Sequence, residues 1–182
     1  MENEIYRSNS SLDKGSKQKM LFVGAIMIFT SLLLIGLGIN KDKVLLSFAF
    51  GLIVLYFILL IIGFVNKPIA YILTNSELWI KRRSGLIKIN LVDTKLIREF
   101  NQDDKKGLYR KFGAEGLFGN FGTYSSKLHK TFKVYTSRDS NWVLIVTNSG
   151  KKIVISPDDL ILIDRTNELI NKITGHNKVH NP

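Results

Sequence analysis

The chain contains no cysteine, and it has only three histidines in 182 residues. The absence of thiols excludes disulfide bonds, thiolate catalysis and cysteine-ligated zinc or iron–sulfur sites. The histidines, His129, His176 and His180, are scattered, and no HExxH or comparable ligand spacing occurs. A GxSxG motif is also missing. The sequence therefore predicts a protein that is not an enzyme, with no catalytic residues, no metal site and no cofactor.

Charge is missing from two long stretches, residues 20–39 and 44–65. Because a helix rises about 1.5 Å per residue, each stretch is long enough to cross the ~30 Å hydrocarbon core of a bilayer. The polar residues Asn40–Lys43 between them leave room only for a tight turn between antiparallel helices. Residues 20–65 are therefore predicted to form a transmembrane helical hairpin. Since no ionisable side chain lies inside either stretch, we expect an anchor rather than an ion or proton path.

Lysine and arginine are unevenly distributed around the two stretches. The outer ends of the hairpin carry Arg7, Lys14, Lys17, Lys19, Lys67, Lys81, Arg82 and Arg83, whereas its turn carries only Lys41 and Lys43. The positive-inside rule then places both termini in the cytoplasm and predicts a multi-pass protein of the cell inner (plasma) membrane. A cleaved signal peptide is the competing interpretation of the first stretch. It is disfavoured by the preceding acidic residues and by the second stretch that follows directly.

The two ends of the chain have little apolar character. Residues 1–19 are rich in Ser, Asn, Gly and Lys, and residues 176–182 are also polar, so we expect both to be disordered tails. Small residues occur within the hairpin, among them Ser47 and Gly51 at a four-residue spacing. They indicate either close packing of the two helices against each other or the contact face of a homo-oligomer.

From residue 68 the pattern changes to short segments rich in β-branched and aromatic residues, separated by turn residues. We expect strands at 70–74, 77–81, 86–91, 94–100, 132–136, 142–147 and 151–155. The string Ser156–Asp159 is typical of a helix start, and Gly175 would end that helix. Six or seven antiparallel strands followed by an amphipathic helix predict an α+β, mainly β soluble domain over 68–175, whose helix covers the open end of a barrel or sandwich.

Several strings in this domain resemble the bacterial pleckstrin-homology (PH) domain family. They are Tyr71-x-Leu73-Thr74 with Leu78 and Ile80, the glycine-rich segment Arg110–Tyr124, Tyr135–Arg138 and Ile153–Asp159. The resemblance implies a PH-like antiparallel β-barrel of about seven strands capped by a C-terminal α-helix, and a binding or assembly role. Eukaryotic PH domains hold phosphoinositides with basic residues around the first strand turn. The corresponding turn here, Thr74–Ser76, has none.

A glycine-rich segment, Lys105–His129, stands out within the domain. Its glycines at 113, 116, 119 and 122 recur every third residue and alternate with aromatic residues, namely Phe112, Phe118, Phe121 and Tyr124. Neither GxGxxG nor GxxxxGK[ST] is present, so the segment is not a phosphate-binding loop. One interpretation is a long loop that packs its rings on the barrel. The other is a loop that binds a partner or dips into the bilayer, because connections of this length are often functional.

Positive charge exceeds negative charge in the soluble part. From residue 66 onward there are 20 Lys and Arg against 11 Asp and Glu, and the whole chain carries a formal charge of +11. For a domain tethered beside a bilayer, the nearest polyanion is the membrane surface. The candidate contacts with anionic lipid are Lys81, Arg82, Arg83, Arg110 and Lys111. Nucleic acid is not expected, because no reading motif accompanies the charge.

The sequence thus predicts a non-catalytic, membrane-anchored PH-like module that binds or scaffolds at the cytoplasmic face of a bacterial membrane. Its expected partners are the membrane itself, an anionic lipid surface and an unidentified protein. The candidate binding residues are Lys81, Arg82, Arg83, Arg110, Lys111, Phe112, Phe118, Phe121 and Tyr124. The alternative interpretation is an accessory subunit of a larger membrane complex for transport, secretion or envelope stress.

Overall fold

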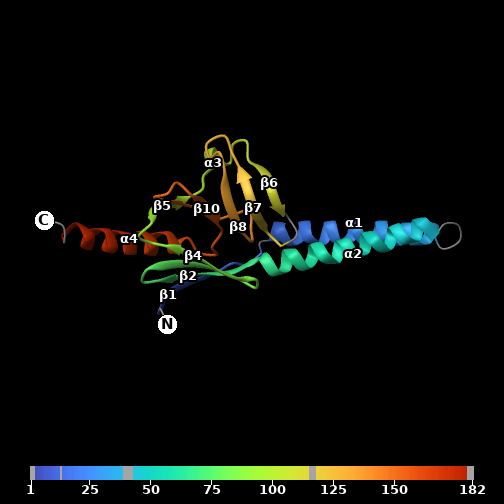
Figure 1. Ribbon diagram of the computed structural model, residues 1–182, viewed down its shortest axis with the longest axis horizontal. Coiled ribbons are helices and arrows are strands. Elements are labelled where there is room, and N and C mark those ends of the chain that lie inside the picture. Colours follow the sequence, from blue (N-terminus) through green and yellow to red (C-terminus); the bar gives the residue numbers. More distant parts are fainter. Residues whose placement is uncertain (1–2, 13, 39–42, 115–117, 180–182) are drawn as a thin grey trace.

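Two long helices extend from one side of a β-rich body in the computed structural model (Figure 1). The structure describes residues 3–12, 14–38, 43–114 and 118–179. Helix α1 spans Lys14–Gly38 and helix α2 spans Lys43–Asn66, and the two run side by side as a hairpin. Most of the predicted turn between them, residues 40–42, lies outside the described residues.

The surface of this hairpin is apolar. The segments long and apolar enough to cross a membrane are Lys17–Leu37 and Leu46–Asn66, with mean hydropathies of 2.5 and 2.9. A core helix would hide such side chains, yet Phe22, Phe29 and Phe50 are each 68% exposed. All backbone polar groups of a helix interior are paired within the helix, so this surface suits contact with hydrocarbon. The prediction of two helices apolar enough to span a membrane is confirmed.

The segment before the hairpin forms a strand. Strand β1, Glu4–Asn9, pairs antiparallel with β2, Pro68–Thr74, which is followed by β3, Glu77–Arg82, and β4, Gly85–Asn90. These strands form a four-stranded sheet in the order β1-β2-β3-β4. The disordered tail predicted at 1–19 is therefore wrong for the strand and for the first turns of α1. The polar composition of this segment hid a strand whose partner lies some 65 residues away.

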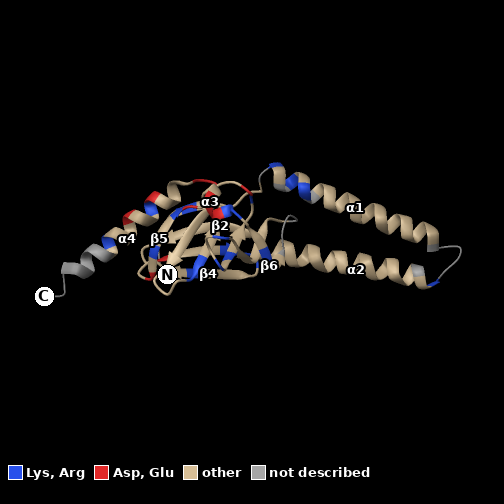
Figure 2. Ribbon diagram, turned by 90° about the horizontal axis from the view of Figure 1, so that it is seen from above, with Lys and Arg blue, Asp and Glu red and all other residues tan. Residues whose placement is uncertain are grey.

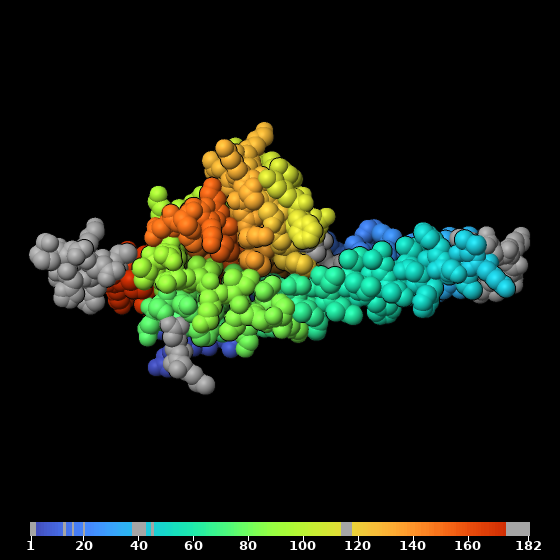
Figure 3. Space-filling view, in the orientation of Figure 1, coloured from blue at the N-terminus to red at the C-terminus, as the bar shows by residue number. Residues whose placement is uncertain are grey.

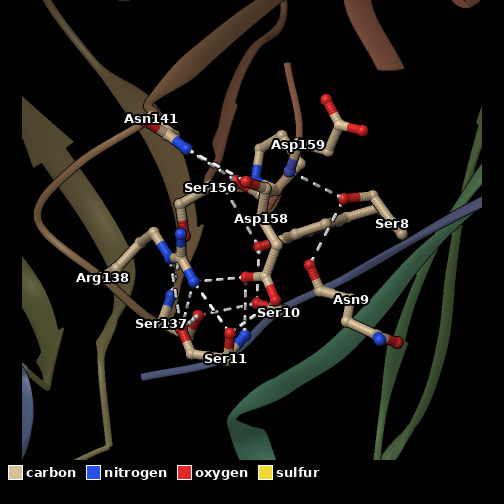
Figure 4. Close-up of polar contacts among 12 residues, drawn as sticks. Ser8, Asn9, Ser10, Ser11, Ser137, Arg138, Asn141, Ser156, Asp158 and Asp159 are labelled. Atoms are coloured by element: carbon tan, nitrogen blue, oxygen red, sulfur yellow. Dashed lines mark hydrogen bonds and ion pairs between the residues drawn. The ribbon is translucent and has the colours of Figure 1, made fainter. Parts of the chain in front are cut away.

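Side-chain hydroxyls fasten this N-terminal segment to the rest of the body (Figure 4). The hydroxyl of Ser10 donates to the hydroxyl of Tyr71 at 3.2 Å, and the amide of Asp159 donates to the hydroxyl of Ser8 at 3.2 Å. The carboxylate of Asp158 accepts hydrogen bonds from Ser11 and also forms an ion pair with Arg138. The N-terminal segment is thus part of the folded body, joined to it by both backbone and side-chain hydrogen bonds.

The second sheet has six strands in the order β5-β9-β10-β8-β7-β6. Its members are β5, Thr94–Glu99; β6, Tyr109–Ala114; β7, Asn120–Ser125; β8, Phe132–Thr136; β9, Val143–Thr147; and β10, Lys152–Ile155. A short helix α3, Gln102–Lys105, follows β5. Most neighbouring strands are antiparallel, but β10 and β8 are parallel, so the prediction of a wholly antiparallel set was wrong on this pair.

The core has two layers because the second sheet is buried on both faces. Along β9, Val143 and Ile145 point into a cluster with the first sheet and α4, whereas Leu144 points into an aromatic cluster on the opposite face. The period of two along a strand explains this division. It also explains why β9 is a continuous apolar run rather than an alternating one.

Helix α4, Ile161–Val179, ends the chain and packs on the first of these layers through Leu162, Leu169 and Ile170. It begins four residues later than predicted, since Ser156 does not cap it. The hydroxyl of Ser156 instead accepts a hydrogen bond from the amide of Ser137, and the carboxylate of Asp159 accepts one from the amide of Ile161. The helix continues past Gly175, so the C-terminal tail predicted at 176–182 is helical as far as Val179, and the rest lies outside the described residues.

The mixed α+β architecture with a C-terminal helix behind two apolar N-terminal helices is confirmed, and it is compatible with a PH-like fold. The predicted closed barrel is not confirmed. Within the described ranges the chain forms ten strands in two sheets that do not close on each other. The glycine-rich segment adds two of these strands as the β6–β7 pair, and β1 adds the third that the sequence did not predict.

Candidate functional site

The glycine-rich segment is a β-hairpin rather than the predicted long loop. Strands β6 and β7 pair with Gly113 opposite Gly122, and both glycines have positive φ angles, of 121° and 130°. A Cβ atom on Gly122 would lie 2.2 Å from the backbone oxygen of Phe112, so only glycine allows the two strands this close approach. The recurring glycines therefore bring strand backbones together. Residues 115–117 of the segment lie outside the described residues.

This hairpin lies against the end of α2, at the junction between the helices and the body (Figure 3). The ring of Phe118 packs edge-on against the ring of Phe64, with centroids 6.0 Å apart. It also covers Gly63, where a Cβ atom would lie 2.7 Å from the Phe118 ring. In the turn between β3 and β4, the guanidinium of Arg83 lies 3.9 Å from the centroid of the Phe64 ring. The hairpin and the β3–β4 turn are thus both fixed to the last turns of α2.

A cavity of about 670 Å³ lies between these elements, and we call it the junction cavity. Its apolar wall is formed by Leu59 and Ile62 of α2, and its aromatic wall by Phe112, Phe121 and Tyr135. The charged residues that line it are Arg82, Arg110, Lys111 and Lys133. No aspartate or glutamate lines it within the part of the chain that the structure describes.

A β-bulge and an alternating strand bring these cations together. The register of β6 shifts between Arg110 and Phe112, which leaves Lys111 as an additional residue on that strand. Bulges re-aim side chains, and here both Arg110 and Lys111 line the cavity, although adjacent residues of a regular strand point to opposite faces. On β8, Lys133 and Tyr135 share one face because they are two residues apart.

The cations of the junction cavity have only neutral partners. Arg82 donates from Nη1 to the side-chain oxygen of Asn66 at 3.2 Å, and its guanidinium lies 5.6 Å from the centroid of the Tyr135 ring. Lys111 and Lys133 each donate to a threonine hydroxyl at 2.9 Å. Among the described residues, none of the four cavity cations forms an ion pair. As far as the described residues show, the cavity is therefore a site of uncompensated positive charge.

One donor in this group is left over. The Nε atom of Arg82 is buried and has no hydrogen-bond partner among the described residues. An unsatisfied buried donor costs about 1–3 kcal/mol. Nearby, burial lowers the pKa of Lys67, and the positive charges of Arg83 and Lys17 lower it further. Positive groups therefore crowd together where the body meets the helices, and an anion placed there would relieve both effects.

The residues predicted as candidate contacts lie in four different surroundings in the structure. Arg82, Arg110, Lys111, Phe112 and Phe121 all line the junction cavity. Arg83 and Phe118 pack on the end of α2 beside it, and Lys81 is exposed on β3. Tyr124 does not belong to this surface, because it is 2% exposed and forms part of the aromatic core with Phe132.

Sequence reasoning missed several lining residues. Lys133 was not among the candidates, although the alternation of the string Phe132–Thr136 places it with Tyr135 on one strand face. Leu59 and Ile62 were assigned only to a membrane helix, and Asn66 lay between the predicted helix and the predicted domain with no role assigned. No local signal marks them, because their role depends on where the hairpin packs.

A second polar cluster lies on the far side of the second sheet. The buried carboxylate of Asp104 accepts two hydrogen bonds from Arg98, at 2.7 and 2.9 Å, and one from the amide of Asn101 at 2.7 Å. The Nε2 atom of His129 lies 2.7 Å from the same carboxylate. Mainly through Arg98, these contacts hold the pKa of Asp104 well below its usual range. The cluster fixes α3 to β5 and to the segment after β7.

In the described ranges, no group of three or more His, Asp or Glu side chains is placed to hold a metal ion. Acidic residues gather instead on α3 and along α4, as the red ribbon in Figure 2 shows. The basic residues at the end of the body next to α2 are coloured blue in the same view. Lysine and arginine also occur beside the acids of α3 and α4, where Lys106 pairs with Asp103 and Lys172 pairs with Glu168.

Comparison with known proteins gives one match. The family profile described as Bacterial PH domain matches residues 69–169, which covers more than half of the chain. No significant match was found among curated proteins or among solved structures. PH domains are generally non-catalytic binding modules. The matched range begins within β2 and ends within α4, so it includes the junction-cavity residues that come from the body but not those from α2. The chain belongs to the bacterial PH domain family.

Proposed function

We propose that this protein is a membrane-anchored, non-catalytic PH module that binds the anionic surface of a bacterial inner membrane from its cytoplasmic face. In this arrangement α1 and α2 cross the bilayer, and the β6–β7 hairpin lies at the level of the lipid headgroups. The observation that carries the proposal is the junction cavity, where cations that have no acidic partner in the described part of the chain lie directly beside apolar residues of a potential membrane span.

The exposed side chains of β6 support the same placement. Phe112 is 80% exposed and Tyr109 is 56% exposed, both unusually high values for aromatic residues in a folded body. Both lie on the strand that also carries Arg110 and Lys111. A basic residue close to an anionic leaflet contributes about 1 kcal/mol, and aromatic rings favour the interface between water and hydrocarbon. Strand β6 therefore combines the two kinds of side chain that bind a membrane surface.

Hydrogen exchange of the full chain in lipid nanodiscs tests this proposal. Amides of 109–125 should exchange more slowly in discs that contain phosphatidylglycerol than in discs of phosphatidylcholine alone, and 0.5 M salt should remove the difference. At this salt concentration the Debye length is about 4 to 5 Å, so the attraction between exposed charges is largely screened beyond that distance. The variant Phe112→Ser should reduce the protection, whereas Leu128→Ser, at another exposed apolar position, should not. Equal exchange in both kinds of disc would overturn the proposal.

The second candidate function is an accessory subunit of a larger membrane complex. The observation that favours it is that Gly36 and Gly51 in the helices have no atom within 4 Å of the position of a Cβ, so both are open to a neighbouring helix. Purification in mild detergent distinguishes the two functions. One stoichiometric protein partner would favour the subunit, whereas a second copy of this chain would indicate a homo-oligomer of the module.

A further inference from the structure

The two ends of the junction cavity differ in chemistry. Leu59 and Ile62 lie within the segment Leu46–Asn66 that is long and apolar enough to cross a membrane. With a rise of about 1.5 Å per residue, the cavity follows α2 for about 10 Å from Asn66 toward the interior of that segment. The opposite end holds the guanidinium of Arg82 and the other cations. The cavity therefore has the polarity of an amphiphile, with a charged end at the body and an apolar end along the helix.

The partners of the other half-buried arginines, Arg98 and Arg138, show how Arg82 differs from them. Arg98 is paired with the buried Asp104, and Arg138 is paired with Asp158. Arg82 is half-buried like them, yet its described contacts are an amide oxygen and an aromatic ring, and its Nε atom has no partner. Guanidinium groups bind phosphate through two parallel hydrogen bonds, which require adjacent N–H donors. Arg82 lines the cavity and forms no ion pair among the described residues, so its guanidinium can take this role for a phosphate held there.

We propose that the junction cavity binds one molecule of a net anionic diacyl phospholipid. The lipid phosphate occupies the space between Arg82, Arg110, Lys111 and Lys133, and one acyl chain lies along Leu59 and Ile62. This inference rests on the proposed membrane location, and it adds a specific site with one-to-one stoichiometry to the general attraction between the basic surface and the bilayer. The site is separate from the turn Thr74–Ser76 between β2 and β3, which does not line the cavity.

A lipid is the occupant that fits both ends. A free phosphate ion would pair with the cations but leave the apolar wall of α2 empty, and a detergent-like apolar molecule would leave four cations without counter-charge. The basic lining favours a net anionic lipid over a zwitterionic one, since a choline group would place a further positive charge near Lys111 and Lys133.

Native mass spectrometry of the full chain in detergent tests the site. We expect one bound phosphatidylglycerol that survives a high-salt wash, and a much smaller signal with phosphatidylcholine or with inorganic phosphate. Arg82→Gln should lower the phosphatidylglycerol occupancy about tenfold, as expected from the loss of charge-assisted hydrogen bonds. Lys95→Gln removes one positive charge from an exposed position on β5 that does not line the cavity, and it should leave the occupancy unchanged.

Two further variants keep the result interpretable if Arg82→Gln disturbs folding. Arg110→Gln changes an exposed residue and should also lower the occupancy, while Ile62→Trp fills the apolar end without changing any charge and should exclude the acyl chain. Circular dichroism melting checks that each variant is folded. Equal occupancy in the wild-type protein and in folded Arg110→Gln and Ile62→Trp would overturn the proposal, as would binding of inorganic phosphate as strong as that of the lipid.

The same measurements separate this site from the general surface binding. If no discrete lipid is retained but hydrogen exchange in nanodiscs still depends on anionic lipid, the cavity proposal fails and the surface-binding function stands. If a discrete lipid is retained although exchange is the same in both kinds of disc, the surface-binding function fails and the cavity proposal stands.

Discussion

The hydroxyl of Tyr71 accepts a hydrogen bond from the hydroxyl of Ser10, 61 residues earlier in the chain, at a distance of 3.2 Å. Both helices of the hairpin lie between these two residues in the sequence. Because Ser10 and Tyr71 are in contact, the chain segments before α1 and after α2 lie on the same side of any membrane that the hairpin crosses. The structure thus supports an even number of crossings independently of the charge count.

Removal of the Tyr71 hydroxyl should loosen the N-terminal strand. This hydroxyl also accepts from the amide of Ser156 at 3.1 Å and donates to the backbone oxygen of Tyr135 at 2.8 Å. Tyr71→Phe leaves these buried groups unpaired, so we expect a loss of about 1–3 kcal/mol in the free energy of unfolding. Urea denaturation in detergent measures the loss. Tyr109→Phe, at an exposed tyrosine, is the control and should change little.

Acid should destabilise the attachment of α3 through Asp104. The pKa of this carboxyl is lowered in the folded protein, mainly by Arg98, so below pH 4 the unfolded chain binds a proton that the folded chain does not. The stabilisation is therefore complete above about pH 4 and decreases as the pH falls toward the folded pKa. Urea denaturation measures the free energy of unfolding at pH 6 and at pH 3. The decrease between the two pH values should be smaller for Asp104→Asn than for the wild-type protein.

At pH 6 the same Asp104→Asn variant should lose about 3 kcal/mol of stability. This is the lower end of the range for breaking a buried ion pair, because the side chain of Arg98 is 34% exposed and water partly compensates it. Asp103→Asn changes the neighbouring carboxylate, which is 80% exposed, and serves as the matched control. A loss of similar size in both variants would contradict the role assigned to Asp104.

Gly122→Ala should disrupt the β6–β7 hairpin. The φ angle of 130° is unfavourable for alanine, and the new Cβ would lie 2.2 Å from the backbone oxygen of Phe112. We expect a loss of more than about 2 kcal/mol and faster hydrogen exchange of 109–125. Gly150→Ala is the control, because its φ is also positive, at 79°, but no atom lies within 4 Å of the new Cβ. It should cost only about 1 kcal/mol.

Labelling of single cysteines should determine the orientation of the hairpin. Since the chain has no cysteine, Asn3→Cys, Lys172→Cys and Lys43→Cys each introduce a unique thiol. All three positions are exposed in the structure. In intact cells, a membrane-impermeant maleimide should react with the thiol at 43 and not with those at 3 and 172, because the positive charge flanking the hairpin favours cytoplasmic termini. Labelling at 3 and 172 but not at 43 would reverse the predicted orientation.

The sequence by itself determined the elements whose signals are local. The charge-free stretches predicted both helices of the hairpin. Segments rich in β-branched and aromatic residues, separated by turn residues such as Asn75–Ser76 and Ser149–Gly150, located seven of the strands, to within two residues. Matching strings of consecutive residues also indicated the family. Such signals depend only on residues that are close together in the sequence, so they can be recognised without the tertiary structure.

Only the tertiary structure decided which distant segments meet. Strand β1 forms because it pairs with β2, which follows the helical hairpin in the sequence. Strands β6 and β7 form because glycines that face each other let the two backbones approach closely. Tyr124 proved to be a core residue and Lys133 a lining residue, since facing directions depend on strand register and on the bulge at Lys111. The junction cavity arises where residues from α2, β3, β6, β7 and β8 converge, and pairing energies between such remote segments leave no pattern in the local sequence.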